Sequence, residues 1–298
     1  MTQHPLKTTF AFFPGCSLEA TAWDYRQSTS AALEALGVPF EELDDWVCCG
    51  STPAHATDPD LAAALPALNL QKAKEKALPV MAACAACYSR FRTANHRIAA
   101  DAALKNRVTT LTGAPYDGDV PVRHLLDVIM NDLGPNAVKA KVTQPLNGLK
   151  VACYYGCLLT RPREIAAFDD PENPSCMDEL VEALGGAPVS WPYKTECCGA
   201  SHAVPNPELT ARLTHRILEM AQRAGADCIA LACQMCQMNL DLGQAAAAKV
   251  GPLSDIPVLY ITQLLGLALG QSPKQVGLKA LVVGADSLLS KMNMDKAS

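Results

Sequence analysis

Ten cysteines of this chain recur in a single pattern that occurs twice. The first copy reads PGC at 14–16, CCG at 48–50 and CAAC at 84–87, and the second reads YGC at 155–157, CCG at 197–199 and CQMC at 233–236. In both copies 34 residues separate the cysteine pair from the CxxC motif (50–83 and 199–232), whereas the first spacer has 31 residues (17–47) in one copy and 39 (158–196) in the other. A period of about half the chain indicates a duplicated unit and not a solenoid.

Other segments repeat in the same order and locate the boundary between the copies. Val122–Gly134 matches Val258–Gly270, and Leu36–Pro39 matches Leu184–Pro188 with one extra glycine in the second copy. We therefore predict two domains, residues 1–146 and residues 147–298.

Strand and helix patterns alternate in each copy. Short apolar strands are predicted at 8–13 and 149–154, each ending near the first cysteine of its copy. The further predictions are helices at 31–36, 59–76, 175–184 and 207–223, strands at 79–83 and 228–232 that end at the CxxC motifs, and a closing strand and helix in each copy. This alternation favours an α/β fold with one parallel sheet in each unit, the two units being related by pseudo-two-fold symmetry. Because ligands gather beyond the carboxyl ends of parallel strands, we expect the five cysteines of each copy to converge.

Composition excludes several classes of protein. The formal charge of −5 and the pI of about 5.7 argue against a nucleic-acid-binding protein. No apolar run approaches the roughly 20 residues of a membrane span, and Met1–Thr9 carries no export signal. We therefore expect a soluble cytoplasmic protein. In that compartment 13 cysteines indicate metal ligands or redox groups and not a disulfide framework.

Five thiols in each copy exceed the needs of a simple metal site. A structural zinc and a cubane iron–sulfur cluster each take four ligands. Adjacent cysteines can bind two neighbouring metal atoms, and Gly50 and Gly199 remove a side chain beside each pair. The pattern therefore favours a multinuclear centre of soft metal. The alternative is a set of buried apolar cysteines or zinc-binding cysteines with a purely structural role.

The cysteine pattern resembles the tandem cysteine-rich CCG domains in the B-type subunit of heterodisulfide reductase over nearly the whole chain. PGCSLE at 14–19, YYGC at 154–157 and DDPENP at 169–174 add to the resemblance. It implies that each set of five thiols holds a non-cubane [4Fe-4S] cluster, with zinc in the first motif as the alternative. The implied ligands are Cys16, Cys48, Cys49, Cys84 and Cys87 in the first set, and Cys157, Cys197, Cys198, Cys233 and Cys236 in the second.

The resemblance also implies an activity and partners. The two clusters would face a shared cavity and cleave a disulfide reductively, each giving one electron, or form the disulfide in the reverse direction. Electrons would arrive from a ferredoxin-like subunit of the C type, which is supplied by a flavoprotein subunit of the A type. The chain has neither a C-x2-C-x2-C-x3-C-P run nor a GxGxxG motif, so it must receive electrons from another polypeptide. The alternatives are an electron relay without substrate chemistry, and a zinc-stabilised scaffold or thiol sensor.

Four other residues are candidates for the catalytic site. His55 and His202 follow the two cysteine pairs and could donate a proton to a leaving thiolate, because histidine titrates near neutral pH. Lys194 and Arg161 lie close in sequence to ligands of the second set and could attract an anionic substrate or favour thiolates. Ordinary capping or surface roles are the alternative for all four.

Three cysteines lie outside the repeated pattern. Aligning Gly156-Cys157 with Gly15-Cys16 places Cys153 opposite Phe12 on the predicted strand. Cys157 is therefore the predicted ligand. Cys153, Cys176 and Cys228 are predicted to be structural.

Overall fold

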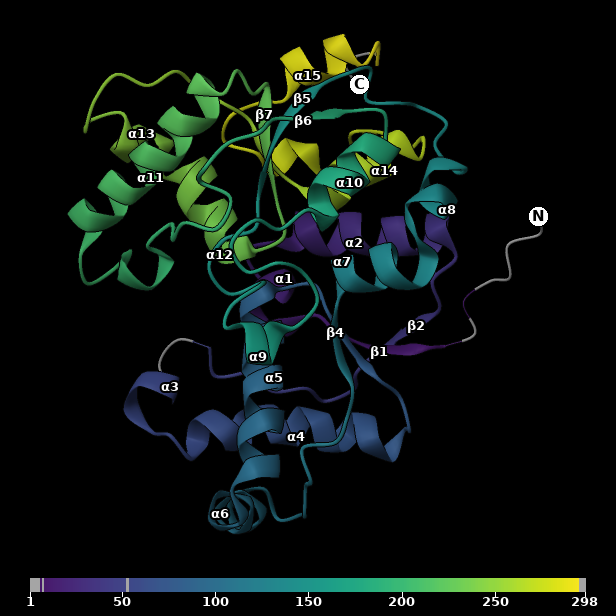
Figure 1. Cartoon of the computed structure of the whole chain (residues 1–298), viewed down its shortest axis with the longest axis vertical. Coiled ribbons are helices and arrows are strands. Elements are labelled where there is room, and N and C mark those ends of the chain that lie inside the picture. Colours follow the sequence, from purple (N-terminus) through teal and green to yellow (C-terminus); the bar gives the residue numbers. More distant parts are fainter. Residues whose placement is uncertain (1–5, 7, 52–53, 295–298) are drawn as a thin grey trace.

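Two four-stranded sheets organise the computed structural model, which describes residues 6, 8–51 and 54–294 (Figure 1). The strand orders are β2-β1-β3-β4 and β6-β5-β7-β8, and all neighbouring strands are parallel. The second order repeats the first with four added to each strand number. The predicted duplicated α/β fold is therefore confirmed, whereas the boundary between residues 146 and 147 stays a prediction.

The first half contains the first sheet and the helices that connect its strands. Its elements are β1 (Phe10–Phe13), α1 (Gly15–Glu19), α2 (Trp23–Leu36), β2 (Phe40–Glu42), α3 (Ala54–Thr57), α4 (Leu61–Glu75), β3 (Val80–Ala82), α5 (Ala85–Ala100), α6 (Ala102–Thr112), β4 (Val122–His124), α7 (Leu125–Asp127), the π-helical turn η1 (Val128–Leu133) and α8 (Pro135–Lys139).

The second half repeats this order with shorter helices after its CxxC motif. Its elements are β5 (Lys150–Tyr154), α9 (Arg163–Ala166), α10 (Cys176–Ala183), β6 (Ala187–Pro188), the 3-10 turn η2 (Ala200–His202), α11 (Pro207–Arg223), β7 (Cys228–Leu231), α12 (Gln234–Gln237), the π-helical turn η3 (Met238–Leu242), α13 (Gln244–Ala247), β8 (Val258–Tyr260), α14 (Ile261–Ala268), the 3-10 turn η4 (Leu278–Ala280) and α15 (Asp286–Lys291).

The central strands are short and apolar, as the sequence predicts. All residues of β1, β3 and β7 are buried, which is typical of parallel strands covered on both faces. Their registers place Phe12 beside Met81, and Cys153 beside Ala230. The predicted helix at 207–223 has the same bounds in the structure.

The helix predicted at 31–36 is wrong at its start, because α2 begins at Trp23. Its buried face includes the polar residues Ser28 and Thr29, so hydrophobicity alone does not show the helical period in this segment. The Ser28 hydroxyl forms a 2.8 Å hydrogen bond with the hydroxyl of Thr262 on α14. A contact with the distant second half thus allows the polar face of α2 to be buried. Helices α5 and α6 were not predicted from the sequence.

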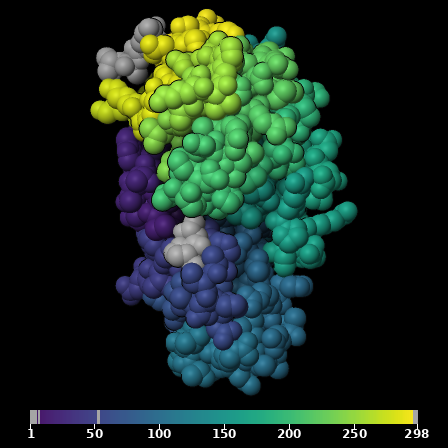
Figure 2. All heavy atoms as spheres, turned by 90° about the vertical axis from the view of Figure 1, so that its left-hand side faces the viewer, coloured from purple at the N-terminus to yellow at the C-terminus, as the bar shows by residue number. Residues whose placement is uncertain are grey.

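Equivalent helices pack against each other across the interface between the two halves. Helix α2 packs against α14, and its counterpart α10 in the second half packs against α7, which is the counterpart of α14 (Figure 1). Such reciprocal contacts are those of a two-fold arrangement. The rings of Tyr25 and Tyr260 stack at this interface, with centroids 3.9 Å apart and planes 3° from parallel. Figure 2 shows the green and yellow second half stacked on the blue first half.

Asp24 places a buried carboxyl group at the same interface. It lies on α2 and accepts a 3.3 Å hydrogen bond from the side-chain amide of Gln263 on α14. Burial raises the pKa of Asp24 to about 6. Between its ordinary pKa and pH 6 the folded chain therefore holds a proton that the unfolded chain releases, and this contribution to stability is lost as the pH rises through 6.

We therefore expect the stabilisation of the protein by Asp24→Asn to grow as the pH rises. Its melting temperature should exceed the parent's by about 3–6 °C at pH 8 and by about half as much at pH 5, because the amide carries no charge to bury. Anaerobic scanning calorimetry of both proteins at the two pH values measures this. An equal difference at pH 5 and pH 8 would show that the effect is not due to ionisation of Asp24.

Among the described residues, no helix combines the length and the apolar character that crossing a membrane requires.

Candidate metal centre

The three cysteine motifs of each half follow three neighbouring strands. In the first half, Cys16 follows β1, the pair Cys48-Cys49 follows β2, and Cys84 follows β3. Strand β1 lies between β2 and β3 in the sheet. The three loops therefore meet at the carboxyl edge of the sheet, as predicted. The second half repeats the arrangement with β5, β6 and β7.

The thiols of the first half meet at that edge. The Sγ atoms of Cys49 and Cys87 are 3.2 Å apart, and Cys48 makes thiol contacts with both Cys16 and Cys49. Cys84 is the N-cap of α5, and its Sγ accepts a 3.3 Å hydrogen bond from the backbone N–H of Cys87. The amino end of a helix favours negative charge, so this position suits metal-binding thiolates.

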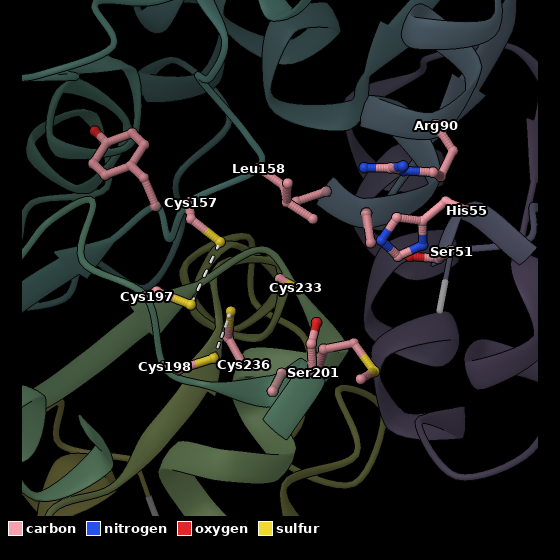
Figure 3. A pocket seen from close by; sticks show the side chains of 15 residues that line it. Ser51, His55, Arg90, Cys157, Leu158, Cys197, Cys198, Ser201, Cys233 and Cys236 are labelled. Atoms are coloured by element: carbon pink, nitrogen blue, oxygen red, sulfur yellow. Dashed lines mark hydrogen bonds between the residues drawn. The ribbon is translucent and has the colours of Figure 1, made fainter. Parts of the chain in front are cut away.

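The thiols of the second half converge in the same way (Figure 3). The Sγ atoms of Cys157 and Cys197 are 3.9 Å apart, and those of Cys198 and Cys236 are 3.6 Å apart. The backbone N–H of Gly199 donates a 3.4 Å hydrogen bond to the Cys197 sulfur. The N–H of Gly50 does the same for Cys48, at the same distance.

The two CxxC motifs lie against each other across the interface between the halves. The thiols of Cys84 and Cys233 are in hydrogen-bonding contact. The side-chain amide of Gln234 donates a 2.8 Å hydrogen bond to the Cys84 sulfur. The two sets of thiols therefore lie next to each other and not apart.

Two glycines allow the backbone to approach the thiols closely. Gly15 and Gly156 have φ angles of +73° and +69°, which favour glycine. A Cβ atom at Gly15 would lie 3.2 Å from the Cys87 sulfur, and one at Gly156 would lie 3.3 Å from the Cys236 sulfur. A side chain at either position would occupy space beside the ligands.

Gly50 and Gly199, which follow the two cysteine pairs, have leucine side chains as their nearest neighbours. Their Cβ atoms would lie 3.0 Å from Leu65 and 2.9 Å from Leu213 respectively. Their φ angles of +71° and +77° also favour glycine. These glycines therefore let the cysteine pairs turn closely over the long helices α4 and α11.

The thiols have unequal proton affinities. Hydrogen bonding from Cys49 lowers the pKa of Cys48 to about 5 and raises the pKa of Cys49. Hydrogen bonding from Cys157 lowers the pKa of Cys197 to about 6 and raises the pKa of Cys157. Thiolates therefore form readily within each set, and the thiolate is the form that binds metal.

The donor set fits an iron–sulfur centre. Each set offers five thiols as candidate ligands, some of which accept hydrogen bonds from backbone N–H groups, and soft thiolates are the ligands of such clusters. In the described ranges, no three His, Cys, Asp or Glu side chains surround one point as ligands of a single metal ion. The thiols instead contact one another in pairs.

A cavity of about 150 Å³ adjoins the second set of thiols. All five sulfur ligands of that set line it, together with residues of the first half. Those residues are Ser51, His55, Ala85, Ala86 and Arg90. In Figure 3, Arg90, His55 and Ser51 face Cys157, Cys197, Cys198 and Cys236 across this space. The cavity is therefore built by both halves.

The structure places the two candidate histidines differently. His55 lies on α3 and lines the cavity. His202 lies in η2 and is exposed, and its charge helps to lower the pKa of Cys197. Only His55 is thus placed to reach a molecule in the cavity, and the catalytic role of either histidine stays a prediction.

Lys194 and Arg161 both form ion pairs. The Lys194 ammonium lies 2.8 Å from the Asp178 carboxylate and also donates to the carbonyl of Pro174 at 3.0 Å. The Arg161 guanidinium lies 2.9 Å from Glu172. It also donates to the hydroxyl of Thr195, at 2.9 Å. These bonds hold the segment before the second cysteine pair, and the predicted catalytic roles of both residues stay untested.

The cysteines outside the pattern are buried in the body of the second half. Cys153 lies on β5 and Cys228 on β7, each with 0 % of its surface exposed, and Cys176 begins α10. Burial raises the pKa of all three thiols. Cys157, and not Cys153, reaches the second set of ligands.

Four residues of the site were not predicted from the sequence. Asn69 binds the backbone N–H of Val47 at 2.9 Å, and the side chain of Asn239 binds the carbonyl of Cys198 at 2.9 Å, so both fix the cysteine-pair loops. Gln234 stands inside a CxxC motif and Arg90 follows Cys87 by three residues, or about one helical turn. Gln234 and Arg90 could have been found from their sequence positions beside the cysteine motifs. No feature of the sequence points to the two asparagines.

Comparison with known proteins identifies the repeated unit. The family model of the CCG cysteine-rich domain matches residues 10–92 and 151–241, which is more than half of the chain. The "8-methylmenaquinol:fumarate reductase membrane anchor subunit" of Wolinella succinogenes is 33% identical over 95% of this chain and 100% of its own length.

Two archaeal relatives carry the name of one enzyme component, the B-type subunit of heterodisulfide reductase. That of the "Ferredoxin:CoB-CoM heterodisulfide reductase" of Methanosarcina mazei is 33% identical over 95% of this chain and 96% of its own length. A protein of Archaeoglobus profundus that is named as similar to this subunit is 29% identical over 90% of this chain and 92% of its own.

A solved structure shares the fold. A hypothetical protein from Helicobacter pylori superposes with a TM-score of 0.73 at 14% identity, covering 95% of this chain and 54% of that one. The present chain thus spans about half of that protein. Taken with the near-complete coverage of the archaeal relatives, the two matched cysteine-rich domains show that this chain belongs to the family of B-type heterodisulfide reductase subunits.

Proposed function

We propose that this chain is the catalytic subunit of a heterodisulfide reductase-like complex, which reductively cleaves a disulfide or forms it in reverse. Its relatives are named as subunits of heterodisulfide reductases. The observation that carries the proposal is that the two five-thiol sets meet at one interface. There the side-chain amide of Gln234, from the second CxxC motif, donates a 2.8 Å hydrogen bond to the Cys84 sulfur of the first set. Disulfide cleavage takes two electrons, and two adjacent centres can supply them together.

Each set of five thiols would hold one non-cubane [4Fe-4S] cluster in this proposal. Such clusters, when bound, supply one electron each. The glycines at 15 and 156 leave the space beside the ligands open. Zinc in the first set is the alternative.

The chain's own residues would bind the substrate and supply a proton. A disulfide takes up two electrons and two protons as its S–S bond breaks and two thiols form. The apolar walls of the cavity, which include Ala85, Ala86, Leu158 and Met235, would limit the access of water. His55 lines the cavity and is the proposed donor of one proton to a leaving thiolate. We assign Lys194 and Arg161 to holding the loop before Cys197, because both already bind carboxylates.

The proposed partners follow from what the chain lacks. No sequence motif for a cubane relay or a flavin occurs in it. A ferredoxin-like iron–sulfur subunit would deliver electrons, and a flavoprotein subunit would supply that partner.

Stoichiometric reaction of the reduced protein tests this function. The anaerobically purified protein is reduced with dithionite, freed of the excess and mixed with 3,3′-dithiodipropionate, 2-hydroxyethyl disulfide or cystamine. We expect reoxidation of the protein together with release of two thiols for each disulfide consumed. Reduced protein that releases no thiol from any of the three would contradict the proposal.

An electron-relay role is the second candidate. The equal identity, 33%, to a subunit of a quinol:fumarate reductase favours it. A relay predicts that the reduced protein leaves every disulfide unchanged but is rapidly oxidised by a water-soluble menaquinone analogue. The two candidate functions therefore predict opposite outcomes when the reduced protein is mixed with a disulfide: release of two thiols, or no reaction.

Gln234 is expected to make the two centres unequal. Its amide donates to the Cys84 sulfur, whereas Ala85, its counterpart in the first CxxC motif, has no donor to offer Cys233. Hydrogen bonds to ligand sulfurs raise reduction potentials. Gln234→Leu should lower the potential of the first-set centre by on the order of 20–60 mV and leave the other nearly unchanged.

A redox titration followed by electron paramagnetic resonance measures that difference. Met235→Leu changes the next residue of the same motif without removing a hydrogen bond and serves as the matched control. Equal potentials in the parent and Gln234→Leu proteins would show that the bond does not tune the centre.

A further inference from the structure

Asp241 is a buried carboxylate that holds a segment from the last part of the chain. It lies in η3, five residues after Cys236, and only 4 % of its surface is exposed. Its two oxygens accept hydrogen bonds from successive backbone N–H groups, that of Val282 at 2.8 Å and that of Val283 at 3.1 Å. Burying a carboxylate costs free energy unless hydrogen bonds compensate it, so these two bonds clamp residues 282–283 onto η3.

The turn that carries Asp241 is linked to two ligands of the second set. It begins two residues after Cys236. The side chain of Asn239, within the turn, donates a 2.9 Å hydrogen bond to the carbonyl of Cys198. The Sγ atoms of Cys198 and Cys236 are 3.6 Å apart. A displacement of η3 would therefore change the spacing of two ligands at once.

The first half has a contact of the same kind at the equivalent position. Arg92 follows Cys87 by five residues, as Asp241 follows Cys236. Its Nε donates a 2.7 Å hydrogen bond to the carbonyl of Ile165 on α9. In each half, the side chain at this position thus binds the backbone of a covering segment, as a donor in the first half and as an acceptor in the second.

A second pair of contacts supports this equivalence. Eight residues after the same two cysteines lie Asn95 and Gln244. Their side-chain amides donate 2.7 Å hydrogen bonds to the carbonyls of Val120 and Ile256, each two residues before the closing strand of its half. The helical segments after the two CxxC motifs are therefore matched residue by residue, although their covering segments differ.

The second half depends more strongly on its covering segment. Helix α5 continues as a regular helix to Ala100, whereas α12 changes after Gln237 into the π-helical turn η3. Such turns are rare and lack the regular i→i+4 bonds of an α-helix. Contacts from outside the turn, such as those of Asp241, are then needed to fix its position.

We propose that Asp241 is a positioning residue for the second metal centre, which acts by clamping residues 282–283 onto η3 and so fixes the spacing of Cys198 and Cys236. This inference rests on the clusters of the proposed function. Loss of the clamp leaves all five thiols of the second set in the chain but lets two of them move. The second centre then loses metal faster and changes its reduction potential, whereas the first centre keeps both properties.

Two variants break the clamp from opposite sides. Asp241→Asn removes one acceptor oxygen and places an amide N–H group against a backbone N–H group. Val282→Pro removes a backbone donor and keeps the carboxylate, and the Val282 side chain is 60 % exposed. Val282→Ala keeps the donor and is the matched control. Asp227→Asn is the control for the aspartate, because Asp227 pairs with Lys291 on α15 and lies before β7, on the other side of the sheet from the ligands.

Release of iron to a chelator from the anaerobically purified full chain measures the effect. The paramagnetic signal that Cys198→Ser removes identifies the second centre. We expect Asp241→Asn and Val282→Pro to speed iron release from the second centre about tenfold or more, with release from the first unchanged. A redox titration followed by electron paramagnetic resonance should show a shifted midpoint for the second centre alone. Both controls should match the parent within about twofold.

Two results would overturn the inference. One is equal acceleration at both centres, which would assign Asp241 to general stability. The other is parental release rates and potentials in both clamp variants. Failure of the proposed function looks different: the parent protein then holds zinc and no iron, yet the clamp variants still release half of that zinc faster.

Discussion

Cys49→Ser is expected to abolish the paramagnetic signal of the first centre, and Cys198→Ser that of the second. Both cysteines are buried, and each Sγ contacts the second cysteine of its CxxC motif, Cys87 at 3.2 Å and Cys236 at 3.6 Å. A serine hydroxyl is a harder and less acidic ligand than a thiol and fits iron–sulfur clusters poorly. Each change should remove about half of the bound iron and nearly all disulfide reduction, because one remaining centre supplies only one electron.

The chain offers matched controls in its other cysteines. Cys228 is equally buried but lies on β7, away from the ligand sets. Cys228→Ala should keep its full iron content and lose only about 1 kcal/mol of stability. Iron analysis and electron paramagnetic resonance on all three variants give the comparison. Full iron content in Cys49→Ser or Cys198→Ser would make the assignment of these ligands wrong.

Tyr25→Ala should give the largest loss of stability expected from a residue outside the ligand sets. Tyr25 is fully buried, stacks on Tyr260 of the second half and donates a 2.6 Å hydrogen bond to the carbonyl of Ala83. Removing a buried aromatic ring typically costs about 3–5 kcal/mol. For a chain of this size that corresponds to a fall of about 10 °C in the melting temperature.

The same change should disturb the metal centre, because Ala83 directly precedes Cys84. Tyr25→Phe keeps the ring and loses only the hydroxyl. The Ala83 carbonyl then retains the 3.0 Å hydrogen bond from His124, so we expect a loss of only about 1 kcal/mol. Scanning calorimetry of the three proteins measures these effects. Similar melting temperatures for Tyr25→Ala and Tyr25→Phe would show that the ring does not hold the halves together.

The ligand convergence could be predicted because it depends on local pattern. Apolar runs ending at cysteines predicted strands, and parallel strands place their carboxyl ends at one edge of a sheet. Residue spacing also predicted that Cys157, and not Cys153, belongs to the second set, and the Cys157 thiol indeed lies 3.9 Å from that of Cys197. These inferences needed no knowledge of how the two halves pack.

Features that depend on packing between the halves could not be predicted. The polar face of α2 is buried because Ser28 meets Thr262, a residue far away in the sequence. The surroundings of Gln234 and Arg90 come from the opposite half, through Cys84 in one case and the shared cavity in the other. Arg161 and Lys194 lie near ligands in sequence, yet they bind carboxylates that local spacing does not reveal.

The metal and sulfide content of the anaerobically purified protein tests the central claim most directly. Two five-thiol sites that hold non-cubane clusters predict about eight iron and eight acid-labile sulfide per chain, with no stoichiometric zinc. One or two zinc ions per chain without iron or sulfide would contradict the claim and assign the thiols to a structural scaffold.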